Sequence, residues 1–133
     1  MYTIAHHTAD VRLKVSSASY EGLLADALSG LVEILAPSGP PEGRVSRHFE
    51  VESSDRTTLL VDILNEILWH AHVHNEIFDS IRIERISETS ATITLSGRVV
   101  PGFGEDVKAV TYHDADVSPD DAGVWSTTLV LDI

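Results

Sequence analysis

The spacing of apolar residues in "LLVDILNEIL", residues 59–68, constrains the fold of this chain more than any other feature. Leucine and isoleucine recur there every three or four residues, which is the period of one helix face. The apolar positions are Leu59, Leu60, Ile63, Leu64, Ile67 and Leu68, and the polar positions include Asp62, Asn65 and Glu66. With Asp55 as a plausible N-cap, the segment predicts an amphipathic helix. We expect it to end in a loop at residues 69–76, "WHAHVHNE".

A second amphipathic helix is predicted earlier in the chain. Ser19 stands where an N-cap would stand. Leucines follow it at helical spacing, at Leu24, Leu28, Leu31 and Leu35. Pro37 and the following "SGPPEG" end this helix and predict a loop, because proline cannot continue the helical hydrogen-bond ladder.

Alternating apolar and polar residues surround the two helices. In "VRLKV", residues 11–15, apolar and basic side chains alternate, which is typical of a strand with one face in water. Strands are expected over residues 1–5, 11–17, 44–53, 76–86, 90–100, 106–117 and 123–133, with a hairpin turn at 87–90. The pattern predicts an α+β fold, a single compact domain over residues 1–133 that is mostly antiparallel sheet with two amphipathic helices.

The bulk composition is that of an ordinary globular domain. Of the 133 residues, 43% are hydrophobic and 23% are charged. There is no cysteine, which excludes a disulfide scaffold and cysteine-based catalysis. The N-terminal segment does not read as a signal peptide, and no apolar run approaches membrane-spanning length. We therefore expect a cytoplasmic protein with no membrane partner.

The charge narrows the class of partner. Nine Lys and Arg face 21 Asp and Glu, which gives a formal net charge of −12. Such a surface repels phosphate backbones, so direct, stable binding to nucleic acid is not expected. Cations and basic protein surfaces are the favoured partners.

The final predicted strand ends in two acidic groups. Leu131 would lie in the core and fix the backbone, which brings the side chain of Asp132 and the α-carboxylate of Ile133 close together. Two such carboxylates repel unless a proton or a cation joins them. Oxygen donors suit Ca²⁺, Mg²⁺ or Mn²⁺, and Asp10 would add a third donor if its strand neighbours the last one. The alternative is that Asp132 is a solvated strand end.

Four motifs occur in an order and at spacings that resemble the archease family over residues 2–133. They are "HHTADV" at 6–11, "LLVDILNEIL" at 59–68, "VKAVTYH" at 107–113 and the terminal "VLDI". The resemblance implies a small, non-enzymatic accessory protein of the RtcB-type RNA ligase, which acts in tRNA splicing, tRNA processing and RNA repair. Proteins of this family promote guanylylation of the ligase histidine and support repeated turnover.

The resemblance also implies a set of functional residues. The family's metal site falls on Asp10, Asp132 and the terminal carboxylate of Ile133, with Ca²⁺ the expected ion and Mg²⁺ or Mn²⁺ as alternatives. Lys108, in "VKAVTYH", is expected to matter for ligase activation, by approaching a nucleotide phosphate or an acidic group of the ligase. Lys108 could equally offset the charge of its acidic neighbours. Glu66 is a further candidate for the partner-contacting surface.

Other patterns suggest competing functions. His70, His72 and His74 would share one face on a strand, where they could bind zinc, but would diverge at a helix end. His6 and His7 with the two aspartates suggest a small metal-dependent hydrolase, although no catalytic motif accompanies them. Acidity alone would also suit a chaperone-like interaction module. The dispersed aromatic residues are expected in the core or at its edge; they are Trp69, Trp125 and Tyr112.

Overall fold

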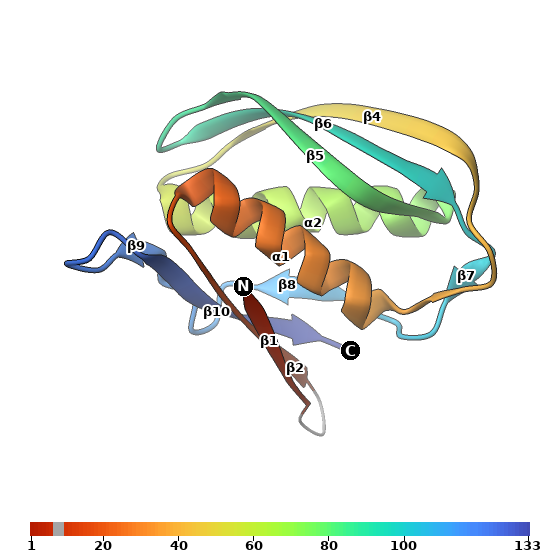
Figure 1. Ribbon diagram of the computed structural model, residues 1–133, viewed down its shortest axis with the longest axis horizontal. Helices are drawn as coiled ribbons and strands as arrows, with labels where there is room; N and C mark the ends of the chain where they lie inside the picture. The colour runs from red at the N-terminus through yellow and green to blue at the C-terminus, as the bar shows by residue number, and fades with distance from the viewer. Residues whose placement is uncertain (7–9) are drawn as a thin grey trace.

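A computed structural model describes residues 1–6 and 10–133 and has three layers, with two helices between two antiparallel sheets (Figure 1). One sheet has the order β1-β2-β10-β8, with β9 also paired to β10, and the other has the order β4-β6-β5. In chain order the elements are β1 (Tyr2–His6), β2 (Asp10–Ser17), α1 (Tyr20–Leu35), β3 (Pro37–Ser38), β4 (Glu42–Glu52), α2 (Arg56–His74), β5 (Glu76–Ile86), β6 (Ser90–Val99), β7 (Gly102–Phe103), β8 (Ala109–Thr111), β9 (Ser118–Pro119) and β10 (Trp125–Asp132). The predicted α+β fold is confirmed.

Both predicted helix starts are confirmed by their capping hydrogen bonds. The Ser19 hydroxyl accepts from the backbone N–H of Gly22, and the Asp55 carboxylate accepts from that of Thr58. Each bond satisfies one of the backbone donors that a helix start leaves free. Helix α1 ends at Ala36, in the left-handed region with φ 48°, directly before Pro37.

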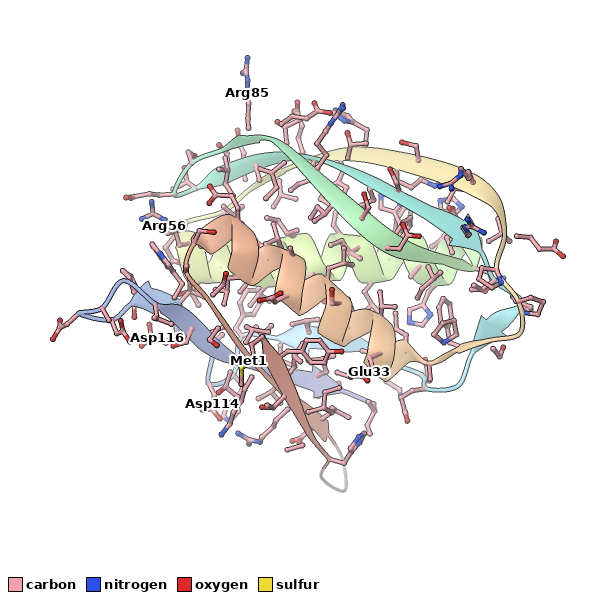
Figure 2. All side chains as sticks on the ribbon, viewed as in Figure 1. Met1, Glu33, Arg56, Arg85, Asp114 and Asp116 are labelled. Atoms are coloured by element: carbon pink, nitrogen blue, oxygen red, sulfur yellow. The ribbon has the colours of Figure 1, made fainter. Side chains whose placement is uncertain are left out.

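The core lies where the two helices meet the inner faces of both sheets. In the β2–β10 pair, Leu13 lies opposite Leu129 and Val11 opposite Leu131, and all four are buried. A Cβ on Gly30 of α1 would come within 2.6 Å of Leu13, so the helix backbone packs directly on this sheet. The outer sheet faces carry polar side chains; Arg85 projects from β5, and Asp114 and Asp116 lie beside the β1-β2-β10-β8 sheet (Figure 2).

The structure corrects four sequence-based expectations. The prediction of a loop at residues 69–76 is wrong, because α2 continues to His74 and is capped by Asn75 in the left-handed region. The strand expected at 106–117 is ordered as a strand only at Ala109–Thr111. Trp69 and Tyr112 are exposed and not in the core, whereas Trp125 is partly buried against the core. In addition, Pro37 lies in a short strand paired with β7 and not in a loop. No helix within the described residues is long and apolar enough to cross a membrane.

Candidate metal centre

Asp10 and Asp132 lie directly opposite each other at the end of the β2–β10 pair. Opposite residues of an antiparallel pair share one sheet face, with Cβ atoms about 5 Å apart. The neighbouring pair, Val11 and Leu131, is fully buried on the other face and fixes this register. The condition on which the sequence placed Asp10 near Asp132, that their strands are neighbours, is therefore met.

The environment of Asp10 is unusual for a carboxylate. Its Oδ1 atom is buried and has no hydrogen-bond partner within residues 1–6 and 10–133. A buried carboxylate oxygen without a partner is costly, so such an atom calls for a ligand, a water or an ion. A hard divalent cation fits this donor set, because it binds carboxylate oxygens and balances the charge of both aspartates.

Two aspartates alone make an incomplete site. Among the described residues, no group of three or more His, Asp or Glu side chains is arranged to hold a metal ion. Within residues 1–6 and 10–133, no third acidic or histidine side chain joins the two aspartates. Ile133 follows Asp132 directly, and its side chain packs against the core.

Arg12 lies on the same sheet face, two residues along β2 from Asp10. Its guanidinium donates to the carboxylate of Asp114 at 2.9 Å. The guanidinium of Arg12 is thus engaged by another carboxylate.

Lys108 is brought to the site through its backbone. Its N–H donates to the carbonyl oxygen of Asp132 at 2.8 Å, just before β8 pairs with β10. The side chain is 63% exposed, and its Nζ lies 3.5 Å from a carboxylate oxygen of Asp106. An exposed ion pair of this kind contributes little to stability, so the ammonium can leave it for another anion.

Side chains of α2 hold the segment around Lys108 in place. Asn65 uses both ends of its amide: the nitrogen donates to the Val110 carbonyl at 2.8 Å, and the oxygen accepts from the Val110 N–H at 2.9 Å. His72 Nε2 lies 2.9 Å from the carbonyl oxygen of Val107. Sequence reasoning assigned neither role, because a single Asn or His on a helix carries no signal for a partner 35 or more positions away.

Glu66 follows Asn65 on α2 and is half-buried. It lies one helical turn before His70, whose protonated form its charge favours. Asn65, the neighbour of Glu66 on α2, lines a small cavity together with Lys108.

The three histidines do not form the zinc site considered from the sequence. All three lie on α2, where His72 turns toward Val107 while the rings of His70 and His74 stack with centroids 5.8 Å apart. Neither is His6 brought together with Asp10, since His6 shares the sheet face of its partner Val11. His7, the other histidine of the predicted hydrolase, lies outside the described residues.

His70 should make stability depend on pH. Burial of its ring lowers its pKa below 6.5, and the positive charges of His74 and Arg47 act in the same direction. In this pH range the unfolded chain therefore binds a proton at His70 more readily than the folded chain does. The free energy of unfolding should accordingly fall as the pH drops from 7 to 5. Urea unfolding at both pH values should show a smaller fall for His70→Phe than for the wild type. An identical fall in both proteins would contradict this assignment.

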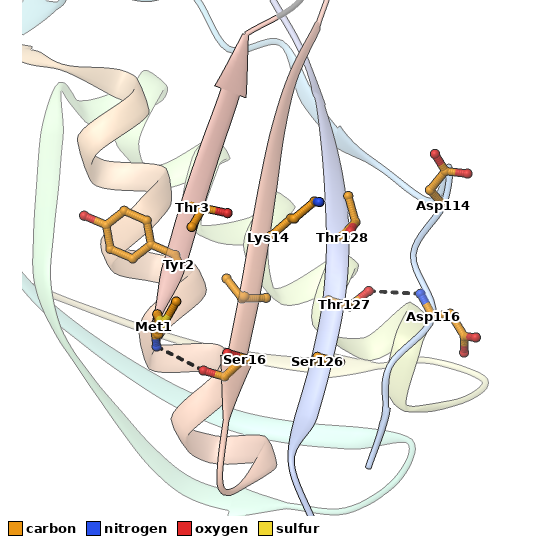
Figure 3. Close-up of a pocket in the computed structure, with 11 residues that line it drawn as sticks. Met1, Tyr2, Thr3, Lys14, Ser16, Asp114, Asp116, Ser126, Thr127 and Thr128 are labelled. Atoms are coloured by element: carbon orange, nitrogen blue, oxygen red, sulfur yellow. Dashed lines mark hydrogen bonds between the residues drawn. The ribbon is translucent and has the colours of Figure 1, made fainter. Parts of the chain in front are cut away.

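A separate cavity of about 520 Å³ lies farther along the outer face of the same sheet (Figure 3). Hydroxyl groups and Lys14 line it, and the N–H of Asp116 donates to the Thr127 hydroxyl at 3.0 Å beside it. Lys14 is four residues from Asp10 on β2, roughly 13 Å at the usual strand rise. This cavity is thus distinct from the paired aspartates.

Comparison with known proteins settles the family. The sequence model of the Archease protein family matches residues 2–133. The chain belongs to the archease family. The archease of Methanosarcina barkeri is 24% identical over 140 residues, which cover 99% of this chain and 95% of that protein. The archease of Methanopyrus kandleri is 28% identical over 134 residues, which cover 96% and 95%.

Two solved structures share the fold. Protein 1598 of Methanobacterium thermoautotrophicum superimposes with a TM-score of 0.73 at 22% identity, covering 99% of this chain and 98% of that one. An archease from Thermotoga maritima, described as a possible chaperone, gives a TM-score of 0.71 at 24% identity and covers 100% and 98%. These likenesses establish the architecture, in agreement with the resemblance seen in the sequence motifs.

Proposed function

We propose that this archease activates an RtcB-type RNA ligase of tRNA splicing and RNA repair. In this proposal it promotes guanylylation of the ligase histidine and supports repeated turnover, and it does not itself catalyse ligation. The observation that carries the proposal is the cross-strand pair of Asp10 and Asp132, with one buried carboxylate oxygen that has no hydrogen-bond partner in residues 1–6 and 10–133. Membership of the archease family supports it.

The paired aspartates would hold a divalent metal together with the main-chain carboxylate of Ile133. All three donors are oxygens, which favours Ca²⁺, with Mg²⁺ or Mn²⁺ as alternatives. When bound, the metal would supply positive charge where a nucleotide triphosphate must approach an acidic protein. The contribution of the chain is a rigid frame, since the Val11–Leu131 pair and the core contact of Ile133 fix the donors before the ligase arrives.

Lys108 would supply the second contact. Its backbone is tied to Asp132, while its exposed ammonium forms an ion pair with Asp106 at the surface. It can therefore turn toward a phosphate or toward an acidic group of the ligase, and a compact ammonium suits both. Glu66 would lie at the edge of the contact surface and face the basic side of the partner.

The net charge agrees with a protein that binds the ligase and leaves RNA binding to the ligase. At −12, the protein is attracted to a basic ligase surface and repelled by RNA, so the ligase binds the RNA substrate. The protein acts on its partner and has no need of RNA contacts of its own.

The proposal is tested by ligation turnover of a purified RtcB-type ligase with GTP, divalent metal and an RNA substrate. Added protein should increase the number of ligations per ligase molecule and the fraction of guanylylated ligase. The protein alone should join no RNA ends. Ligation without ligase, or no stimulation at any protein concentration, would contradict the proposal.

Two alternatives give different results. A chaperone role, as the description of the Thermotoga maritima protein suggests for that protein, predicts that the stimulation survives in Asp10→Ala and Asp132→Ala. A metal-dependent hydrolase predicts turnover of phosphoester substrates that is lost in Asp10→Ala. Of the two histidines in this reading, only His6 lies within the described residues, and it is on the sheet face opposite to that of Asp10.

A further inference from the structure

Helix α2 leaves two large apolar side chains uncovered. Trp69 and Val73 lie one turn apart, and 54% and 53% of their surfaces are exposed. Trp69 contacts the ring edges of His70 and His74, at centroid distances of 4.9 Å and 6.0 Å. Contiguous exposed apolar surface with a polar rim is typical of interaction sites.

The surface around them is concave. A cavity of about 240 Å³ is lined by Asn65, Leu68, Trp69, His72, Val73 and Lys108, which we call the α2 patch. Exposed tryptophan beside a small cavity is typical of the centre of a protein–protein contact, where one aromatic side chain contributes much of the binding energy.

The α2 patch is also rigid. The two hydrogen bonds between Asn65 and Val110, and the contact of His72 with Val107, tie α2 to the segment that carries Lys108. A partner that binds here need not order this segment first, so less binding energy is lost to conformational entropy.

Acidic residues continue the same helix face toward the start of α2. Asp62 lies seven residues before Trp69, and Glu66 lies between them. Asp62 is held by the hydroxyls of Ser53 and Tyr112, which fixes its carboxylate at the surface. A complementary surface would therefore present an apolar pocket for Trp69 next to Lys or Arg side chains.

The negative charge of the protein disfavours a second copy of this chain, lipid or nucleic acid as the partner bound at the α2 patch. In a symmetric pair of this chain, both contacting surfaces would carry Asp62 and Glu66, and like charges brought into one interface are costly. Anionic lipid and nucleic acid are repelled by the net charge of −12.

The α2 patch adjoins the end of β10 through Lys108. Lys108 lines the patch, and its N–H donates to the carbonyl of Asp132 at 2.8 Å. A protein that engages Lys108 and the end of β10 would therefore also cover Trp69.

We propose that the α2 patch is the docking surface for a partner protein whose own surface offers an apolar pocket flanked by basic side chains. This inference rests on the proposed function, in which that partner is the RNA ligase. Trp69 and Val73 provide affinity, whereas Asp10, Asp132 and Lys108 act on the ligase once it is bound.

The test separates docking from activation. Trp69→Ala and Val73→Ala should each raise the dissociation constant for purified ligase in calorimetry, by about tenfold or more for Trp69→Ala. The protein concentration for half-maximal stimulation of ligation should rise by the same factor, and the plateau should stay unchanged. Val99→Ala is the matched control, because Val99 is 43% exposed on β6 and lies outside the α2 patch.

Each possible result of this test either supports or contradicts the docking proposal. A dissociation constant within twofold of wild type for Trp69→Ala, or a lower plateau with unchanged binding, would overturn the inference while the ligase-activator function stands. A concentration-dependent dimer that Trp69→Ala abolishes would assign the α2 patch to a second copy and overturn it as well. If the wild type neither binds nor stimulates the ligase, the proposed function fails, and the docking proposal fails with it. Alanine favours helix, so Val73→Ala keeps the test valid should Trp69→Ala fold poorly.

Discussion

Replacing Asp10 or Asp132 by asparagine is expected to reduce the stimulation of ligase turnover by at least about tenfold, the scale on which metal sites respond to the loss of a supporting group. Asparagine keeps the size of the side chain but removes a negative charge and one strong metal donor. The measurement is the number of ligations per ligase molecule at saturating protein. The two variants should behave alike, because both remove one half of the same cross-strand pair.

Folding provides the control for these variants. In the absence of metal, Asp10→Asn should be at least as stable as the wild type, since it removes a repulsion between opposed carboxylates. Adding Ca²⁺ should raise the unfolding midpoint of the wild type and not that of the variant, because a ligand stabilises only the state that binds it. If Asp10→Asn stimulated the ligase and were stabilised by Ca²⁺ as much as the wild type, the proposed metal centre would be contradicted.

The largest effect on stability is expected at the contact between Arg47 and Glu76. The Glu76 side chain is 1% exposed, at the start of β5. Its carboxylate accepts from Arg47 Nε at 2.9 Å and also from Arg47 Nη2. Arg47→Met leaves this buried carboxylate without its cation, which should lower the free energy of unfolding by about 3 kcal/mol.

A second variant tests the cause of that loss. In Arg47→Met combined with Glu76→Gln, no charge is left buried, so urea unfolding should show a smaller loss than in Arg47→Met alone. If the double variant were as unstable as the single one, packing of the Arg47 chain and not charge would explain the effect. Arg47→Lys should fall between the wild type and Arg47→Met, since lysine keeps the charge but loses the two-pronged contact.

The sequence predicted the elements of the fold better than their arrangement. The leucine spacings located both helices, and Ser19 and Asp55 marked their starts, because these signals are local. The end of α2 was predicted too early, since His70, His72 and His74 interrupt the apolar stripe; Asn75, in the left-handed region, was the local signal for the true end. Periodicity alone does not say which strands pair, so the two sheets enclosing the helices were not predicted.

The arrangement of the candidate metal site, like that of the sheets, depended on strand pairing that the sequence alone does not reveal. That Asp10 and Asp132 face each other was conditional on a strand pairing that the structure now establishes. The anchoring of Val110 by Asn65 and the exposure of Trp69 had no sequence signal, because both depend on which neighbour the tertiary fold supplies. An aromatic residue at the edge of a helical stripe is compatible with either burial or exposure.

The most direct test of the central claim is ligase turnover with two forms of this protein, one ending at Ile133 and one carrying a few extra residues after it. The extension would move the main-chain carboxylate of Ile133 out of the proposed metal centre, and it changes no side chain. We predict repeated turnover of the ligase with the first form and little stimulation with the second, at equal stability of the two proteins. Equal stimulation by both forms would contradict a role for the carboxylate of Ile133 in the metal centre.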